Sequence, residues 1–376
     1  MPECRLNFMS AITCALLFKT VFWNKSFMSE SNLFLRLLSE KRFLLADGAT
    51  GTNLFGMGLQ TGDAPELWNI DYPERVAAHY HSFIEAGSDI ILTNTFGGNR
   101  RRLVLHNAQS RVRELNVAAV TLLKEEIAQS GREIVIGGSM GPTGDILEPN
   151  GPLSVAEAAD VFEEQAQALA GAGADVLWLE TLSSREETEA AVMGAGRLGL
   201  PLVTTLSIDT NGRTMMGLTA ADIMQLQAHL QPHPVACGTN CGVGASEVVA
   251  AVLNFHNAAD QELEPIIIAK ANCGIPEYID GKVVYNGTPE LMARYAQLAM
   301  DAGARIIGGC CGTTPEHVRA MRDAIDRHIV GEKPTLETIL HELGDVSKGA
   351  QAQLKGDLSV AGGAIGEGRR RTSRRR

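Results

Sequence analysis

The chain has 376 residues, a hydrophobic fraction of 45% and a formal net charge of −11. This composition excludes a disordered or fibrous protein, because it supplies enough apolar residues for a packed core. The acidic balance argues against a nucleic-acid partner, since such a domain usually presents a basic face. The seven cysteines are an odd number and five of them follow Pro234, so they do not form the disulfide framework of a small secreted domain. They fit a reducing cytoplasm with reactive or metal-bound thiols better.

The first segment, residues 1–27, is expected to be an extension outside the fold. Its apolar stretch between residues 8 and 22 is too short to span a bilayer comfortably, and no clear signal-peptide cleavage site follows it. Met28 opens a segment that is typical of a cytosolic start. No other stretch is long and apolar enough for a transmembrane helix, so the sequence predicts no membrane association.

A helix followed by a buried strand recurs along the middle of the chain. Three helical patterns end in Ala-Gly and continue into a short apolar run, near Glu85, Gly171 and Asp301. Glycine is the usual residue after the last turn of a helix, and an uninterrupted apolar run is typical of a parallel strand buried on both faces. Eight such strands are predicted, over residues 43–46, 90–93, 134–138, 176–180, 202–207, 235–239, 266–269 and 305–309.

Helical patterns fill the gaps between these strands. Capping signals mark their starts at Tyr72-Pro, Ser154, Ser184, Thr288-Pro and Thr314-Pro. The alternation predicts an α/β fold of the (β/α)8 TIM-barrel type, with residues 28–330 as a single domain. A doubly wound sheet is the alternative, but the turn Asp47-Gly-Ala-Thr-Gly-Thr has no phosphate-binding glycine pattern. Residues 331–376 are predicted to form a helix remnant and a basic tail, disordered over residues 348–376.

Polar and thiol side chains gather at the predicted carboxyl ends of the strands, where the active site of such a barrel is built. They are Asp47, Asn94, Ser139, Glu180, Asn240, Cys241, Asn272, Cys310 and Cys311. Chance would scatter such residues along the chain. The sequence therefore predicts an active site at this end of the barrel.

Three of these residues, Cys241, Cys310 and Cys311, are predicted to bind one Zn²⁺ ion. Neighbours in a regular strand point to opposite faces, so Cys310 and Cys311 reach one ion only if the strand breaks, and Gly309 and Gly312 allow that. Three thiolates suit zinc, and without an obvious fourth protein ligand the ion keeps the open position that catalysis requires. A vicinal disulfide or plain burial of the pair is the alternative.

The other candidates are assigned to substrate binding or to packing. Glu180 ends an apolar strand, so we expect its carboxylate to bind a substrate amine through a charge-assisted hydrogen bond. Asp47 shares that role or caps the following turn, and the backbone N–H groups of Gly48 and Ala49 are candidates for a substrate carboxylate. Two further thiols are interpreted as packing residues, those of Cys237 and Cys273.

Six motifs in chain order resemble the homocysteine S-methyltransferase family. They are Asp47-Gly-Ala-Thr-Gly-Thr, Thr93-Asn-Thr-Phe, Gly138-Ser-Met-Gly-Pro, Leu179-Glu-Thr, Gly238-Thr-Asn-Cys and Gly308-Gly-Cys-Cys-Gly. The resemblance implies a zinc-dependent barrel that methylates homocysteine to methionine, with Cys241, Cys310 and Cys311 on the metal. It also implies substrate contacts at matched positions of these motifs, namely Asp47, Gly48, Ala49, Thr95, Phe96, Glu180 and Asn240.

The mechanism that follows is physically reasonable. Zinc lowers the pKa of a thiol in its open position, and the thiolate attacks a methyl group carried on positive nitrogen or sulfur. No Asp-x-His-x-x-Gly cobalamin motif occurs, so a small free donor is expected. The sequence as a whole is most similar to bacterial betaine–homocysteine methyltransferases. Aromatic faces suit the trimethylammonium of betaine, and the candidates are Phe96, Trp68 and Tyr72.

At two positions this chain differs from the animal betaine enzymes, so methyl donors other than betaine are also considered. The animal betaine enzymes carry aromatic residues beside the matches to Phe96 and Glu180, where this chain has Gly97 and Thr181. S-methylmethionine, S-adenosylmethionine, dimethylsulfoniopropionate and a separate corrinoid or folate carrier are therefore alternatives. A non-catalytic zinc- or thiol-binding sensor is the alternative of another class, and the sequence leaves a homo-oligomer open.

Overall fold

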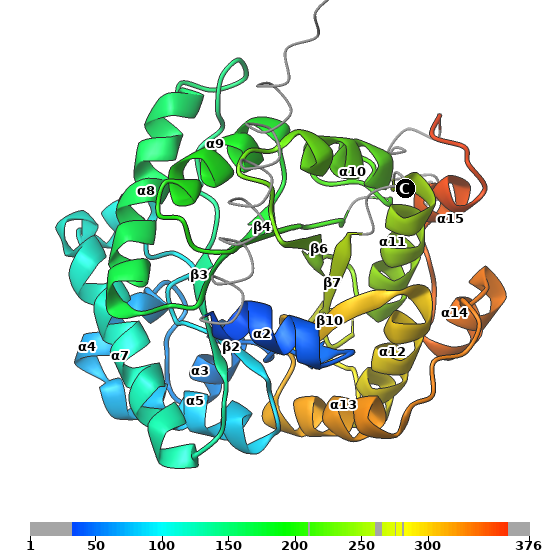
Figure 1. The fold of residues 1–376 in the computed structure, drawn as a ribbon, viewed down its shortest axis with the longest axis horizontal. Coiled ribbons are helices and arrows are strands. Elements are labelled where there is room, and N and C mark those ends of the chain that lie inside the picture. The colour runs from blue at the N-terminus through cyan, green and yellow to red at the C-terminus, as the bar shows by residue number, and fades with distance from the viewer. Residues whose placement is uncertain (1–31, 210, 260–264, 275, 280–281, 360–376) are drawn as a thin grey trace, which may run out of the picture.

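The computed structural model describes residues 32–209, 211–259, 265–274, 276–279 and 282–359. Its centre is a parallel sheet of β1 (Leu44–Leu45), β2 (Ile90–Leu92), β3 (Val135–Met140), β4 (Val176–Leu182), β5 (Leu202–Leu206), β6 (Ala236–Cys241), β7 (Ile266–Ala271) and β10 (Ala304–Gly309). The main helices are α5 (Pro73–Glu85), α7 (Val112–Ser130), α8 (Val155–Ala172), α9 (Arg185–Gly196), α10 (Ala220–His229), α11 (Ala245–Ala258), α12 (Pro289–Ala302) and α13 (Pro315–Arg327). These helices surround the strands in Figure 1.

The strands close into a barrel. Their order is β1-β10-β7-β6-β5-β4-β3-β2, and all of these pairings are parallel. The two ends of this series meet through a parallel bridge between Ala46 and Ile90, where the Asp47 N–H donates to the Ile90 carbonyl at 3.0 Å. The predicted (β/α)8 barrel is confirmed, and each strand lies at its predicted place along the chain.

Several of the helix caps that the sequence indicated are formed, although at the start of α5 the Tyr72 side chain makes no capping hydrogen bond. Ser154 and Glu157 make reciprocal side chain–backbone hydrogen bonds at the start of α8. Thr288 caps α12, and Pro289 occupies its first position, where a missing N–H breaks no helical hydrogen bond. Gly173 ends α8 with a φ of 103°, in the left-handed region that glycine favours. These local signals set the ends of the elements that position the site.

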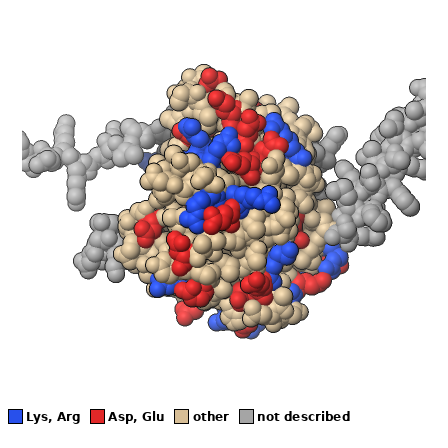
Figure 2. Space-filling view, turned by 90° about the vertical axis from the view of Figure 1, so that its left-hand side faces the viewer, with Lys and Arg blue, Asp and Glu red and all other residues tan. Residues whose placement is uncertain are grey.

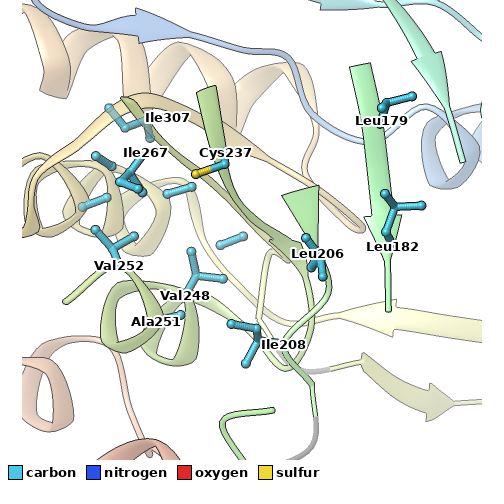
Figure 3. Packing of buried hydrophobic residues seen from close by; sticks show 14 of the residues in the cluster. Leu179, Leu182, Leu206, Ile208, Cys237, Val248, Ala251, Val252, Ile267 and Ile307 are labelled. Carbon is cyan, nitrogen blue, oxygen red and sulfur yellow. The ribbon is translucent and has the colours of Figure 1, made fainter. Parts of the chain in front are cut away.

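The core has two layers. Inside the barrel, aliphatic side chains of the strands meet Phe34 and Leu37 of α2 (Leu33–Glu40), which lies across the amino-terminal end of the barrel (Figure 1). Outside the barrel, strands pack against helices, and Figure 3 shows Val248 and Val252 of α11 in one cluster with Cys237 of β6. Burial raises the pKa of the Cys237 thiol to about 12, which suits a packing residue. Close packing of both layers gives the strand ends a rigid support.

The remaining elements are short and lie in the connections. They are α3 (Gly51–Gly56), α4 (Trp68–Asp71), α6 (Arg100–Leu103), α14 (Leu336–Glu342), and three short 3₁₀ helices, η1 (Pro65–Leu67), η2 (Val104–His106) and η3 (Gln109–Arg111). Among the residues that the structure describes, no helix combines the length and apolar character that crossing a membrane would need.

Two parts of the chain differ from the prediction. β8 (Pro276–Ile279) and β9 (Lys282–Tyr285) form an antiparallel hairpin that the sequence pattern did not indicate. The expectation of disorder is wrong for residues 348–354, because they form helix α15. That helix buries Ala350 and Gln353, and Gln353 Nε2 donates to the Gly212 carbonyl at 2.7 Å. The expected extension, residues 1–27, and the terminal arginine cluster lie outside the described residues.

Acidic and basic side chains are intermingled on the face shown in Figure 2, on the side of α7 and α8. On α8, Asp160 and Glu163 pair with Arg197, and Glu164 Oε2 lies 2.8 Å from Arg100 Nη1. The charges on this face therefore neutralise one another locally.

His79 in α5 makes the stability of the fold depend on pH. Its ring is buried between Tyr80 and Phe83, and within the described residues neither ring nitrogen has a hydrogen-bond partner. Burial lowers its pKa to about 4, so the folded state binds this proton less readily than the unfolded state. The stability contributed by the neutral ring is present above about pH 6.5 and is lost as the pH falls toward about 4.

We therefore expect His79→Phe to lose less stability on acidification than the wild type, by about 2 kcal/mol between about pH 7.5 and pH 5. Urea unfolding at the two pH values measures this difference. His81→Phe is the matched control, because His81 lies on the same helix with a side chain that is 55% exposed. Equal pH slopes for His79→Phe and the wild type would contradict the prediction.

Candidate active site at the carboxyl ends of the strands

A cavity of about 440 Å³ lies at the carboxyl ends of the strands. Its lining includes three thiols, a carboxylate, an ammonium group and parts of the first two strand ends, contributed by Gly48, Ala49, Thr95, Phe96, Glu180, Cys241, Lys270, Cys310 and Cys311. Residues that are far apart in the sequence thus converge in one pocket. A cavity with a few convergent polar groups is the expected form of a small-molecule site.

The three cysteines form a compact cluster. The Sγ atoms of Cys241, Cys310 and Cys311 all lie within 4.8 Å of one another, and those of Cys241 and Cys311 are 3.7 Å apart. Two sulfur ligands of a tetrahedral zinc lie about 3.8 Å apart, because each Zn–S bond is about 2.3 Å long. The donor set therefore fits one zinc ion. All three are free thiols, so the alternative of a vicinal disulfide is not what the structure shows.

Unusual backbone conformations bring these thiols together. Cys241 has a φ of 64°, in the left-handed region that residues other than glycine rarely adopt, so β6 turns sharply at its last residue. Cys310 and Cys311 follow the end of β10 in a turn, which is the strand break that their joint use requires. Gly312 has a φ of 77°, and a Cβ there would lie 2.2 Å from the ring of Tyr285.

The buried side chain of Asn240 stabilises the neighbouring strand ends through hydrogen bonds. Its Oδ1 accepts the Thr181 N–H at 2.9 Å and the Thr205 hydroxyl at 2.7 Å, while its Nδ2 donates to Thr181 Oγ1 at 2.7 Å. Thr181 has a left-handed φ of 63°, which these bonds hold in place. Asn240 is fully buried and its side chain is engaged by Thr181 and Thr205, and its expected contact with the substrate stays a prediction.

Because the three thiols lie close together, the pKa values of Cys311 and Cys241 shift in opposite directions. Hydrogen bonds from Cys241, Cys310 and the Tyr285 hydroxyl lower the pKa of Cys311. Contacts with Cys310 and Cys311, together with burial, raise the pKa of Cys241. A buried cluster that favours one thiolate is suited to receive a cation.

A buried ion pair lies beside the cluster. Lys270 Nζ is 2.8 Å from Asp47 Oδ1, and both side chains are almost completely buried. The same ammonium lies 5.7 Å from the centre of the Trp178 ring. Burial lowers the pKa of Lys270, but the charges of Asp47 and Glu180 outweigh it and raise the pKa overall. The lysine therefore stays protonated and offsets part of the negative charge near the thiols.

Glu180, on β4, faces the same cavity. Its Oε1 accepts the hydroxyl of Ser139 at 2.5 Å. Burial raises the pKa of Glu180 to about 7, against the opposing charge of Lys270. A carboxylate in this state gains from a cationic partner in the cavity, which a substrate amine would provide.

Two of the groups that were expected to contact the substrate, the Asp47 carboxylate and the Ala49 N–H, already have partners within the protein. Asp47 does not line the cavity; its Oδ1 pairs with Lys270, and its Oδ2 accepts the Leu92 N–H at 2.8 Å. The Ala49 N–H donates to the Thr313 carbonyl at 3.1 Å, so it is not free for a substrate carboxylate. Asp47 therefore connects the end of β1 to β2 and to Lys270, a role that differs from the cap on the following turn considered from the sequence, and its contact with the substrate stays a prediction.

Two of the three aromatic candidates for the donor lie away from the cavity. The rings of Trp68 and Tyr72 pack on each other with centres 4.9 Å apart, and the Arg75 guanidinium lies 5.0 Å and 4.7 Å from them. Neither lines the cavity, because α4 and the residue after it direct these rings toward Arg75. Phe96 does line it, with its side chain 39% exposed.

Three residues of the site, Lys270, Ser139 and Tyr285, had no role assigned from the sequence. The signal for Lys270 was a single charge within the apolar run of β7, and Ser139 was noted at a strand end without a role. Tyr285 lies in the hairpin that was not predicted, so no sequence signal pointed to it.

The fold and the site together define a (β/α)8 barrel protein with a cluster of three free thiols, arranged as a metal ion would need them, at the carboxyl ends of its strands. Residues 44–325 match a family model described as homocysteine S-methyltransferase, and the chain belongs to this family. The resemblance seen in the six motifs is thereby confirmed.

The chain is 28% identical over 302 residues to the methionine synthase of Mycobacterium tuberculosis and 27% identical over 311 residues to that of Mycobacterium leprae. The alignments cover 76% and 78% of this chain but 25% of each relative, so the chain spans about a quarter of their length. The homocysteine methyltransferase MmuM from Escherichia coli, in its metallated form, is 24% identical with a TM-score of 0.65, over 78% of this chain and 99% of that one. That likeness supports the fold.

Proposed function

We propose that the protein is a zinc-dependent S-methyltransferase, which transfers a methyl group from a small onium donor to homocysteine and forms methionine. Membership of the family supports homocysteine as the acceptor. The observation that carries the proposal is the convergence of three free thiols and the Glu180 carboxylate in one cavity. These groups suit the two ends of homocysteine, its thiol and its ammonium group.

Cys241, Cys310 and Cys311 would hold the zinc ion. Within the described residues, no His, Asp or Glu joins the three thiols, so the cluster supplies three of the four ligands that zinc prefers. A bound zinc would supply the Lewis acidity that stabilises a substrate thiolate near neutral pH.

The chain's own side chains orient the acceptor and balance its charge. Glu180 binds the substrate ammonium, and the hydroxyl of Ser139 fixes the carboxylate for that contact. Lys270 compensates for the negative charge that Asp47 and Glu180 bring to the buried site. The homocysteine thiol is then held at the end of the cavity where the cysteines lie.

Betaine is the donor that the sequence resemblance favours. The rings of Phe96 and Phe55 both line the cavity and offer faces to a positive methyl-bearing centre. S-methylmethionine, S-adenosylmethionine, dimethylsulfoniopropionate and a separate corrinoid or folate carrier are the other candidates. We place this reaction in the cytoplasm, because free thiols persist in a reducing compartment.

A donor panel with zinc analysis tests the proposal. The purified protein should carry about one zinc per chain, form methionine from homocysteine with at least one small onium donor, and lose this activity on chelation. If the protein binds zinc and homocysteine but forms no methionine with any donor, the alternative of a non-catalytic zinc- or thiol-binding sensor is favoured. Full activity after complete removal of zinc would refute the metal-dependent reaction.

A further inference from the structure

We infer that Glu66 forms a second charged subsite in the same cavity, which binds the cationic centre of the methyl donor. The identity of the ligand as a methyl donor rests on the proposed function, whereas the preference of the subsite for an organic cation rests on the charges and contacts around Glu66.

Glu66 is a buried carboxylate that forms no ion pair among the described residues, although His106 and Arg102 act on it from a greater distance. It lies in η1, lines the cavity, and is only 4% exposed. Its Oε1 accepts the Gly97 N–H at 2.6 Å, and among the described residues no Lys, Arg or His forms an ion pair with it. Removing a carboxylate from water without neutralising its charge is costly, so a cationic ligand would stabilise this position.

Gly97 leaves the carboxylate accessible from the cavity. A Cβ at this position would lie 3.0 Å from Glu66 Oε1, so a larger side chain would cover the acid. The neighbouring ring of Phe96 lies against Gly141, where a Cβ would be 2.6 Å from it. A donor in this cavity would have both the ring of Phe96 and the carboxylate of Glu66 within its walls, and both attract an onium centre.

Basic side chains also line the cavity and act on Glu66. Burial raises the pKa of Glu66, and the charges of His106 and Arg102, which also line the cavity, oppose this rise and favour the carboxylate. A short zwitterion with a positive nitrogen or sulfur and a carboxylate matches this arrangement. Its cationic centre would lie at Glu66, and its carboxylate would lie toward Arg102.

The two substrates would then have separate counter-ions. Glu180 lies on β4 and interacts electrostatically with Cys310, whereas Glu66 lies in the connection that precedes α5 and bonds to the segment after β2. The ammonium of the acceptor and the onium centre of the donor carry the same charge. Two carboxylates in different parts of one cavity keep these like charges apart and bind both.

Glu66→Gln tests the subsite with little structural change, because the amide oxygen can still accept the Gly97 N–H. We expect the KM for the donor to rise about tenfold or more, with the KM for homocysteine unchanged within about twofold. Asp63→Asn is the matched control. Asp63 lines the same cavity but is exposed, and its loss should change the donor KM by less than about twofold. An unchanged donor KM in folded Glu66→Gln would overturn the inference.

Calorimetry without homocysteine separates this inference from the proposed function. The probes are two pairs: betaine with tert-butylacetate, in which an uncharged carbon replaces the quaternary nitrogen, and S-methylmethionine with homoleucine, in which an uncharged carbon replaces the sulfonium. The wild type should prefer the cation in at least one pair, and Glu66→Gln should lose that preference. No preference in either pair would contradict the subsite, even if methionine forms. If the protein prefers the cation but forms no methionine, the cation subsite is supported and the proposed methyltransferase function is rejected.

Discussion

Replacing Cys310 with alanine is expected to abolish zinc binding and methionine formation together. Cys310 contributes one of the three thiols that lie within 4.8 Å of one another, and the described residues offer no fourth side chain to replace it. Disturbing only the partners of metal ligands costs about 10- to 100-fold in affinity, and losing a ligand should cost more. Zinc content after dialysis and methionine formation with the active donor measure the two effects.

Cys237→Ala is the matched control for this variant. Cys237 lies on the same strand as Cys241, but it is packed in the layer between strands and helices and does not belong to the cluster. This variant should keep its zinc and its activity, although thermal unfolding will show a small loss of stability from the missing sulfur. If Cys310→Ala retains zinc tightly, Cys310 is not a zinc ligand and the prediction is contradicted.

The barrel was predictable because its local signals agree with one another. Apolar runs such as residues 306–309 are buried on both faces, and Gly173 and Gly303 end helices where the sequence placed the turns. α15 was missed because its stability comes from contacts made in the folded state, such as the bond between Gln353 and Gly212. Weak apolar periodicity cannot reveal such contacts.

The thiol cluster was predictable for a similar reason. The chain positions of Cys241, Cys310 and Cys311 at strand ends place them on one rim of any parallel barrel. The directions of individual side chains were not predictable from position alone. Asn240 precedes Cys241 but points into the protein, and Trp68 turns toward Arg75, because neighbours from other elements decide these orientations.

Replacing Glu180 with glutamine is expected to leave zinc in place and to weaken homocysteine binding by about 30-fold. Glu180 is the carboxylate that lines the cavity beside the thiols, and the amide keeps its shape and its bond from Ser139. The variant therefore removes the charge that attracts the substrate ammonium. The KM for homocysteine and the binding of norleucine, which has the amino-acid group but no thiol, measure the effect.

Norleucine separates the two ends of the acceptor site. Glu180→Gln should weaken norleucine and homocysteine alike, whereas Cys310→Ala should weaken homocysteine and leave norleucine almost unchanged. Ser139→Ala should give a smaller loss of both ligands than Glu180→Gln, because it removes only the hydrogen bond that orients the carboxylate. If Glu180→Gln binds norleucine as the wild type does, the ammonium lies elsewhere, and Glu180 would serve to balance the charge of Lys270.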